Sequence, residues 1–301
     1  MKNIRGTGTA IVTPFSANSE IDYDATRRLL DYQLAGGVEM IVPLGSTGEN
    51  PTVSNSERTK FLRFVIEYIA GRAFIIAGTG SNDTRSTLAL TREAYDLGAN
   101  AALVVTPYYN KPTPDGLFEH FKAVAGIGIP IVMYNVPSRT GLNMNAETTL
   151  RCAEIPGVVA VKEASADLAQ CMEIIRSAPQ GFRLLSGEDN LTLPLISLGA
   201  DGVISVTSNV VPNEFSRMVR FALKGQFEEA KAIHYELFEL MKILFIESNP
   251  GPAKSALAMM GIIGENYRLP LVGLREQSRK KVREVLMQLE TVVLEEMAEN
   301  R

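Results

Sequence analysis

Short apolar runs recur along the chain at intervals that predict buried β-strands. Each run is nearly continuous rather than alternating, which is typical of parallel strands that are covered on both faces. The runs occupy 6–15, 40–45, 73–80, 101–109, 130–137, 158–165, 182–189 and 202–209. Their number and character predict a parallel sheet of eight strands.

Segments with helical periodicity separate these runs. Ser54 and Glu57 form a capping box at the start of one such segment, and Gly98 and Gly199 suit left-handed C-caps at the ends of others. Eight alternating strand and helix units in about 225 residues fit a (β/α)₈ TIM barrel. A doubly wound open sheet is the alternative, but it usually has fewer strands.

The strand signals stop after Leu223, and the rest of the chain is predicted to be helical. The predicted helices cover 226–247, 253–262 and 274–298, with a break enforced by Pro250 and Pro252. We therefore predict two domains: a catalytic barrel over residues 1–224 and a C-terminal helical domain over residues 225–301.

Composition narrows the class of protein. The chain of 301 residues is 46% hydrophobic, and its net charge of −4 comes from dispersed charges, so we expect neither a nucleic-acid partner nor an anionic membrane partner. There is no signal-peptide pattern at the start and no apolar run of bilayer length. Cys152 and Cys171 are too few for a disulfide framework, which favours a cytoplasmic location.

Polar residues gather at the predicted strand ends, where a barrel places its chemistry. Lys162 is the least expected of them because it interrupts the apolar run "VVAV". It could simply reach water with its stem along apolar surface. In a barrel interior it could instead act as a Schiff-base nucleophile, since apolar surroundings disfavour the charged amine. The barrel context favours the nucleophile.

Other strand-end residues also allow two interpretations. Tyr134 could be a core aromatic, or it could transfer protons to a substrate bound to the lysine one strand further on. Ser46 and Thr47 could shape a loop, or their backbone N–H groups could hold a carboxylate. Arg139 could lie on the surface or clamp an anionic substrate.

Some candidate signals do not support a site. We expect the acidic pair Glu188 and Asp189 to cap the next helix. The segment "GTGSND" has Asp83 where a dinucleotide motif needs its last glycine. His120 and His234 lie on separate helical stretches without a zinc-binding motif, so no metal site is expected.

Four segments together resemble the dihydrodipicolinate synthase family of pyruvate-dependent class I aldolases. They are "GSTGE" after the second run, "TPYYNKP" after the fourth, "YNVPSRTG" after the fifth and "VVAVKEAS" on the sixth. The similarity extends from "GTGTAIVTPF" to "NPGPAK", essentially the whole chain. The arginine of "YNVPSRTG" is typical of the synthases, whereas N-acetylneuraminate lyases usually lack it.

The resemblance implies a condensation of pyruvate with L-aspartate 4-semialdehyde in diaminopimelate and lysine biosynthesis. Lys162 would form the pyruvate imine, and Tyr134 would shuttle protons. The backbone of Ser46 and Thr47 would hold the pyruvate carboxylate, with Ile204 lining the pocket, and Arg139 would receive the second carboxylate. The resemblance thus implies catalytic roles for Lys162, Tyr134, Ser46 and Tyr109, and substrate-binding roles for Thr47, Ile204 and Arg139.

The resemblance also implies an assembly. Ser46, Tyr134 and Tyr109 would form a proton relay in which Tyr109 belongs to the neighbouring subunit of a dimer. Two such dimers would associate into a homotetramer. No metal or organic cofactor is implied, because the imine formed with the lysine itself activates pyruvate.

Two departures from the family pattern lead to predictions. Ser46 stands where threonine is usual; the hydroxyl is kept, so we predict a working relay and little loss of turnover in Ser46→Thr, whereas a large loss would show another role for the serine. Tyr108 and Asn82 match the lysine-inhibitor site of sensitive relatives. Arg58 and Ser86 replace the histidine and glutamate found there, which predicts weak or absent inhibition by lysine.

Two classes of alternative remain open at this stage. The chain could use the same lysine on another aldehyde, as an N-acetylneuraminate lyase or a 2-keto-3-deoxy sugar acid aldolase. It could also be a non-catalytic barrel that binds keto acids, since one fold hosts many functions.

Overall fold

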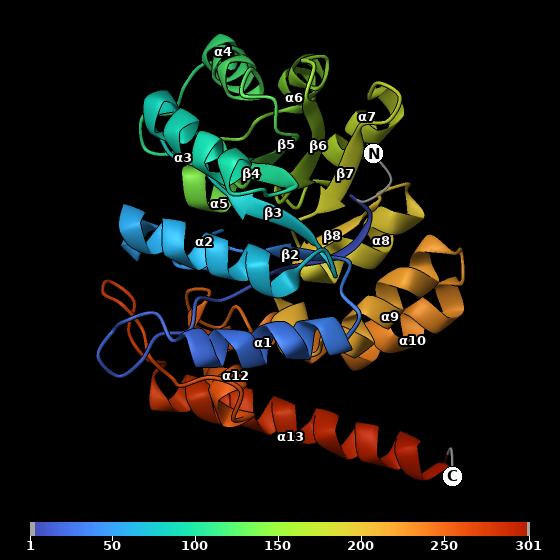
Figure 1. The fold of residues 1–301 in the computed structure, drawn as a ribbon. Helices are drawn as coiled ribbons and strands as arrows, with labels where there is room; N and C mark the ends of the chain where they lie inside the picture. Colours follow the sequence, from blue (N-terminus) through green and yellow to red (C-terminus); the bar gives the residue numbers. More distant parts are fainter. Residues whose placement is uncertain (1–3, 300–301) are drawn as a thin grey trace.

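The computed structural model describes residues 4–299 and shows a closed barrel of parallel strands (Figure 1). The strands pair in chain order, and the last pairs with the first. They are β1 (Gly6–Ala10), β2 (Met40–Val42), β3 (Phe74–Gly78), β4 (Ala101–Val105), β5 (Ile131–Asn135), β6 (Val158–Glu163), β7 (Arg183–Ser186) and β8 (Gly202–Ser205). The predicted (β/α)₈ TIM barrel is confirmed.

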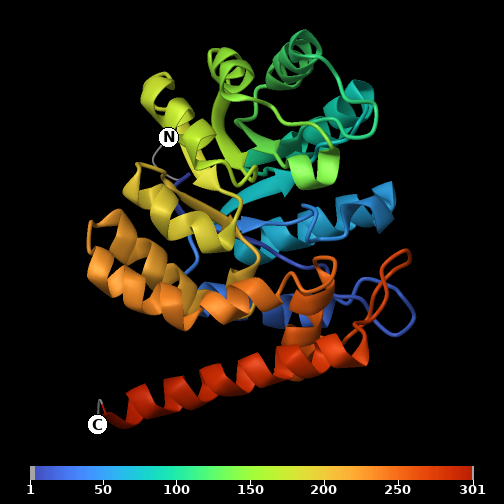
Figure 2. The same cartoon turned by 180° about the vertical axis from the view of Figure 1, so that it is seen from behind.

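Helices surround the barrel, and each follows a strand (Figures 1 and 2). They are α1 (Tyr23–Ala35), α2 (Asn55–Ile69), α3 (Thr84–Asp96), α4 (Pro114–Ala125), α6 (Ala146–Ala153), α7 (Leu168–Ser177), α8 (Thr192–Ser197) and α9 (Pro212–Leu223). A short α5 (Pro137–Thr140) and 3₁₀ turns η1 (Asn50–Thr52), η2 (Asp189–Leu191) and η3 (Thr207–Asn209) complete the strand-to-helix connections. The capping box of Ser54 and Glu57 is present at α2.

Apolar side chains form two separate layers. One lies between the strands and the surrounding helices and includes Phe61, Phe121 and Phe215. The other fills the barrel interior and includes Tyr134 and Ile204. Because side chains alternate along a strand, each barrel strand contributes to both layers. This is why the predicted strands were continuously apolar.

The C-terminal helices are α10 (Phe227–Glu236), α11 (Phe238–Ile243), α12 (Gly251–Met259) and α13 (Glu276–Glu299). The prediction of a single helix over 226–247 is wrong. The chain forms two helices here, separated at Leu237, whose ψ of −4° departs from helical values, and the second helix ends at Ile243. The long α13 lies beside α12 at one side of the molecule (Figures 1 and 2). The domain boundary at residue 224 stays a prediction.

Among the described residues, no helix combines the length and the apolar character needed to cross a membrane.

Candidate active site

Two candidate residues stand side by side on neighbouring strands. Tyr134 of β5 is in register with Lys162 of β6, and both side chains are buried. The amine nitrogen of Lys162 lies 4.3 Å from the centroid of the Tyr134 ring. Ala160 and Ala164, two positions away from Lys162 in either direction, belong to the barrel-interior layer. Lys162 therefore points inward, at the carboxyl end of the barrel.

The residues next to this pair point outward and lock the same two strands together. Asn135 Nδ2 donates to both oxygens of Glu163, at 3.0 and 3.1 Å. Gln170 Nε2 and the Ser165 backbone N–H donate to the same carboxylate, at 3.0 and 2.8 Å. Burial raises the pKa of Glu163, while these donors oppose the rise. The network fixes the relative position of Tyr134 and Lys162, and we expect it to be rigid.

Lys162 lines a cavity of about 500 Å³, which we call the lysine cavity. Its walls come from the ends of several strands and from the segment before α12. Polar and charged lining residues are Ser46, Thr47, Tyr134, Ser138, Arg139, Lys162, Glu188, Glu247, Ser248 and Asn249. Among the described residues, no carboxylate lies within ion-pair distance of the Lys162 amine. The amine thus lines the lysine cavity without an ion-pair partner among the described residues.

The loop after β2 presents donors at the wall of the lysine cavity. The backbone N–H groups of Ser46 and Thr47 donate no hydrogen bond within the described part of the chain. The loop itself is fixed, because Thr13 Oγ1 donates to the Gly48 carbonyl at 2.7 Å and Asn249 Nδ2 donates to Thr47 Oγ1 at 3.0 Å. Two fixed and unpaired N–H groups suit a carboxylate ligand.

Sequence reasoning missed the interaction that anchors this loop. Glu49, in the left-handed conformation with φ of 54°, accepts a hydrogen bond from Lys254 Nζ of α12 at 2.6 Å. Neither side chain is exposed to solvent. Burial lowers the pKa of Lys254, and Glu49 opposes the change. We call this buried ion pair the loop anchor. Nothing local in the sequence signals it, because its members are 205 positions apart.

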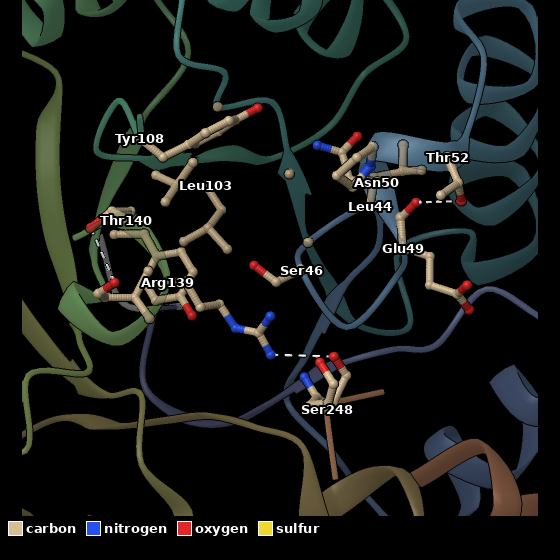
Figure 3. Close-up of a pocket in the computed structure, with 18 of the residues that line it drawn as sticks. Leu44, Ser46, Glu49, Asn50, Thr52, Leu103, Tyr108, Arg139, Thr140 and Ser248 are labelled. Atoms are coloured by element: carbon tan, nitrogen blue, oxygen red, sulfur yellow. Dashed lines mark hydrogen bonds between the residues drawn. The ribbon is translucent and has the colours of Figure 1, made fainter. Parts of the chain in front are cut away.

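Arg139 lies on α5 and turns toward Ser248, as Figure 3 shows. Its Nη2 donates to the carbonyl of Asn249 at 3.3 Å. It lines both the lysine cavity and a neighbouring cavity of about 310 Å³ that Tyr108 also lines. The guanidinium keeps further donors available for an anionic ligand.

Two predicted residues lie apart from the others. Tyr109 is 89% exposed as a residue, and its φ is 73°. It makes no part of either cavity wall in the single chain. Ile204 is buried in the barrel-interior layer, whereas Ala10 and Val206 of the adjoining segments line the lysine cavity. The structure therefore brings together Ser46, Thr47, Tyr134, Arg139 and Lys162.

No group of three or more His, Cys, Asp or Glu side chains in the described residues is arranged to hold a metal ion.

Comparison with known proteins identifies the class to which this barrel belongs. The family model described as "Dihydrodipicolinate synthetase family" matches residues 3–289. A 4-hydroxy-tetrahydrodipicolinate synthase from Parabacteroides distasonis is 47% identical over 289 residues, which are 95% of this chain and 97% of that protein. The dihydrodipicolinate synthase structure from Thermotoga maritima superposes with a TM-score of 0.94 at 44% identity, covering 96% and 99% of the two chains.

Another solved structure is described as the first monomeric dihydrodipicolinate synthase variant. It superposes with a TM-score of 0.93 at 44% identity and covers 95% of this chain and 97% of that one.

The chain belongs to the dihydrodipicolinate synthetase family. It is an enzyme, a lyase of the aldolase type. The names of these relatives do not favour the sugar-acid lyases or the non-catalytic barrel.

Proposed function

We propose that this enzyme is a 4-hydroxy-tetrahydrodipicolinate synthase that joins pyruvate, as an imine of Lys162, to L-aspartate 4-semialdehyde. The observation that carries the proposal is the Lys162 amine, buried and free of any carboxylate partner in the described residues, facing Tyr134 across 4.3 Å. A lysine in that setting is a suitable nucleophile for a keto acid.

The positions of these groups support the first half of the proposed reaction. The Lys162 amine attacks the keto carbon of pyruvate, and loss of water gives the imine. The pyruvate carboxylate binds the free N–H groups of Ser46 and Thr47. Loss of a methyl proton from the imine then gives an enamine, with Tyr134 placed to move protons at the adjacent face of the adduct.

The second half requires a binding group for the aldehyde substrate. The enamine carbon attacks the aldehyde and forms the new C–C bond. Arg139 lines the same cavity and binds the substrate carboxylate through its remaining donors. The substrate's amino group then closes the ring on the imine carbon, and the bond to the Lys162 nitrogen breaks.

Tyr109 supports a further part of the proposal, the assembly. In the single chain the residue is 89% exposed. We propose that it enters the active site of a neighbouring subunit and completes the relay with Ser46 and Tyr134, in a homotetramer built from two dimers. A wild-type enzyme that is a stable and active monomer would contradict this assembly. Full activity of Tyr109→Phe would contradict the role of Tyr109 in the relay. The monomeric variant among the related structures makes the solution state a necessary measurement.

Substrate competition tests the proposed reaction. With pyruvate present, purified enzyme should consume L-aspartate 4-semialdehyde and should not cleave N-acetylneuraminate or 2-keto-3-deoxy sugar acids. Cleavage of a sugar acid at a comparable kcat/KM, without turnover of the semialdehyde, would overturn the assignment. We also propose that the enzyme acts in the cytoplasm, in the synthesis of diaminopimelate and lysine.

A further inference from the structure

The acidic pair that follows β7 divides into two different roles. Asp189 is buried, and its Oδ2 accepts hydrogen bonds from the backbone N–H groups of Val206 and Thr207 at 3.1 and 2.7 Å. It therefore joins the loop after β7 to the turn η3 after β8. The expectation that the pair caps the next helix is wrong, because Glu188 makes no side-chain capping bond there.

The backbone of Glu188 is held firmly. Its carbonyl accepts hydrogen bonds from Ser186 Oγ at 2.7 Å and Thr192 Oγ1 at 3.0 Å, and its N–H donates to Ser186 Oγ at 3.2 Å. The preceding Gly187 donates to the Glu163 carbonyl at 2.7 Å. A Cβ at Gly187 would come within 2.6 Å of the Ala164 Cβ, so glycine permits this close approach to β6. Glu188 is thereby held at the wall of the lysine cavity.

The Glu188 carboxylate is the uncommitted acid of this cavity. No described residue donates a hydrogen bond to its oxygens, whereas Glu247, the other carboxylate in the wall, accepts from the Arg275 N–H at 3.1 Å. Burial and Asp189 raise the pKa of Glu188, and Lys162 and Arg139 lower it. A half-buried carboxylate without a fixed donor suits a ligand that brings its own cationic donor.

We propose that Glu188 binds the α-ammonium group of the amino-aldehyde that condenses with pyruvate, an inference that rests on the proposed function. The substrate carries its carboxylate and its ammonium on the same carbon. Arg139 binds the carboxylate and Glu188 binds the ammonium, while the aldehyde faces the adduct on Lys162. Three fixed points select the amino acid over an aldehyde that lacks nitrogen, and they also select one configuration at the α-carbon.

The test compares two aldehydes that differ at this group: L-aspartate 4-semialdehyde and succinate semialdehyde, which lacks the ammonium. Glu188→Gln keeps the size of the side chain and removes its charge. We expect the preference of the enzyme for the amino-aldehyde, measured as the ratio of kcat/KM values or of competitive inhibition constants, to fall by roughly tenfold to a hundredfold. The KM for pyruvate should not change.

Two further variants control for nonspecific damage. Glu247→Gln removes the other carboxylate of the wall and should leave the ratio unchanged. Glu188→Asp keeps the charge and should retain most of the preference. A ratio that stays constant in Glu188→Gln, or an equal loss for both aldehydes, would overturn the role of Glu188 while wild-type turnover leaves the proposed function standing. Wild-type enzyme that condenses neither aldehyde would overturn the proposed function instead.

Discussion

Two lysines in this enzyme are both buried and equally close to an aromatic ring, but they differ in their charged partners. The amine of Lys162 lies 4.3 Å from the Tyr134 ring, and that of Lys254 lies 4.3 Å from the Phe15 ring. Lys254 donates to Glu49 at 2.6 Å, whereas Lys162 has no carboxylate at ion-pair distance among the described residues. Burial alone therefore does not separate the two lysines; the absence of a carboxylate partner is what makes Lys162 the candidate nucleophile.

The difference also explains how the two lysines cooperate. Lys254 holds Glu49, which follows the Ser46–Thr47 donors by two positions, so the C-terminal helix α12 anchors the wall of the lysine cavity. Lys162 is left free to react within that wall. In the proposed mechanism, the fixed charge would position the binding groups and the free amine would carry out the chemistry.

The largest effect is expected from loss of the free amine. Lys162→Ala should lower kcat by roughly 10⁴ to 10⁶, as removal of a covalent nucleophile does in other enzymes. The thermal midpoint should not fall, because no ion pair is broken. Steady-state kinetics and a melting curve measure both quantities. A variant that keeps a tenth of the wild-type kcat would contradict the role of Lys162.

Loss of the fixed charge should mainly affect stability. Lys254→Met leaves Glu49 buried without its partner and should lower the free energy of unfolding by about 3–5 kcal/mol. The KM for pyruvate should rise because the anchored loop loosens. The double variant Lys254→Met with Glu49→Gln removes the uncompensated charge and should recover most of the stability. Urea unfolding distinguishes the cases, and equal stability of single and double variants would contradict the loop anchor.

A more exposed ion pair beside the loop anchor should contribute less and should depend on pH. The hydrogen bond from Arg268, with further contributions from Ser54 and from the charge of Arg268, lowers the pKa of Glu57 from 4.5 to about 2 against the opposing effect of burial. Because the folded-state pKa is depressed, the contribution is present above about pH 4.5 and is lost as the pH falls toward 2. Glu57→Gln should thus lower the free energy of unfolding by less than about 1 kcal/mol near neutral pH.

The measurement is the difference in the free energy of unfolding between wild type and Glu57→Gln across this acid range. The difference should shrink as the pH falls, and a difference that stays constant would contradict the depressed pKa. Glu239→Gln removes an exposed pair with Lys242 and serves as the control.

The smallest effect is expected from lysine as a free ligand. Ser86 offers no carboxylate for a ligand ammonium. Its backbone N–H and its Oγ both donate hydrogen bonds to Asp83 Oδ2 at the start of α3. Arg58 is buried and donates to the Gly78 carbonyl at 2.8 Å. Millimolar lysine should therefore leave the initial rate almost unchanged. Half-inhibition at submillimolar lysine would show that another acceptor binds the ammonium.

The fold could be predicted from the sequence because its signals are local. Strands covered on both faces are apolar throughout, and Ser54 with Glu57 marks a helix start within one turn. The interruption at Leu237 escaped prediction because it is a change of one backbone angle within an otherwise helical pattern.

The site could be predicted only in part. Barrel geometry places Tyr134 and Lys162 at one level from their strand positions alone. The pairing of Glu49 with Lys254 depends on how α12 packs on the barrel mouth, which no local pattern specifies. The separate roles of Glu188 and Asp189 depend on the direction in which each side chain points. The sequence does not specify these directions, because the two residues are neighbours on a loop without a regular period.

Borohydride trapping with pyruvate, followed by peptide mass spectrometry, tests the central claim most directly. Wild-type enzyme, Lys162→Ala and Lys254→Met are treated in parallel. The account predicts a reduced pyruvate adduct on Lys162 in the wild type and in Lys254→Met, and no adduct in Lys162→Ala. Folded wild-type enzyme without an adduct, or an adduct found on Lys254, would contradict it.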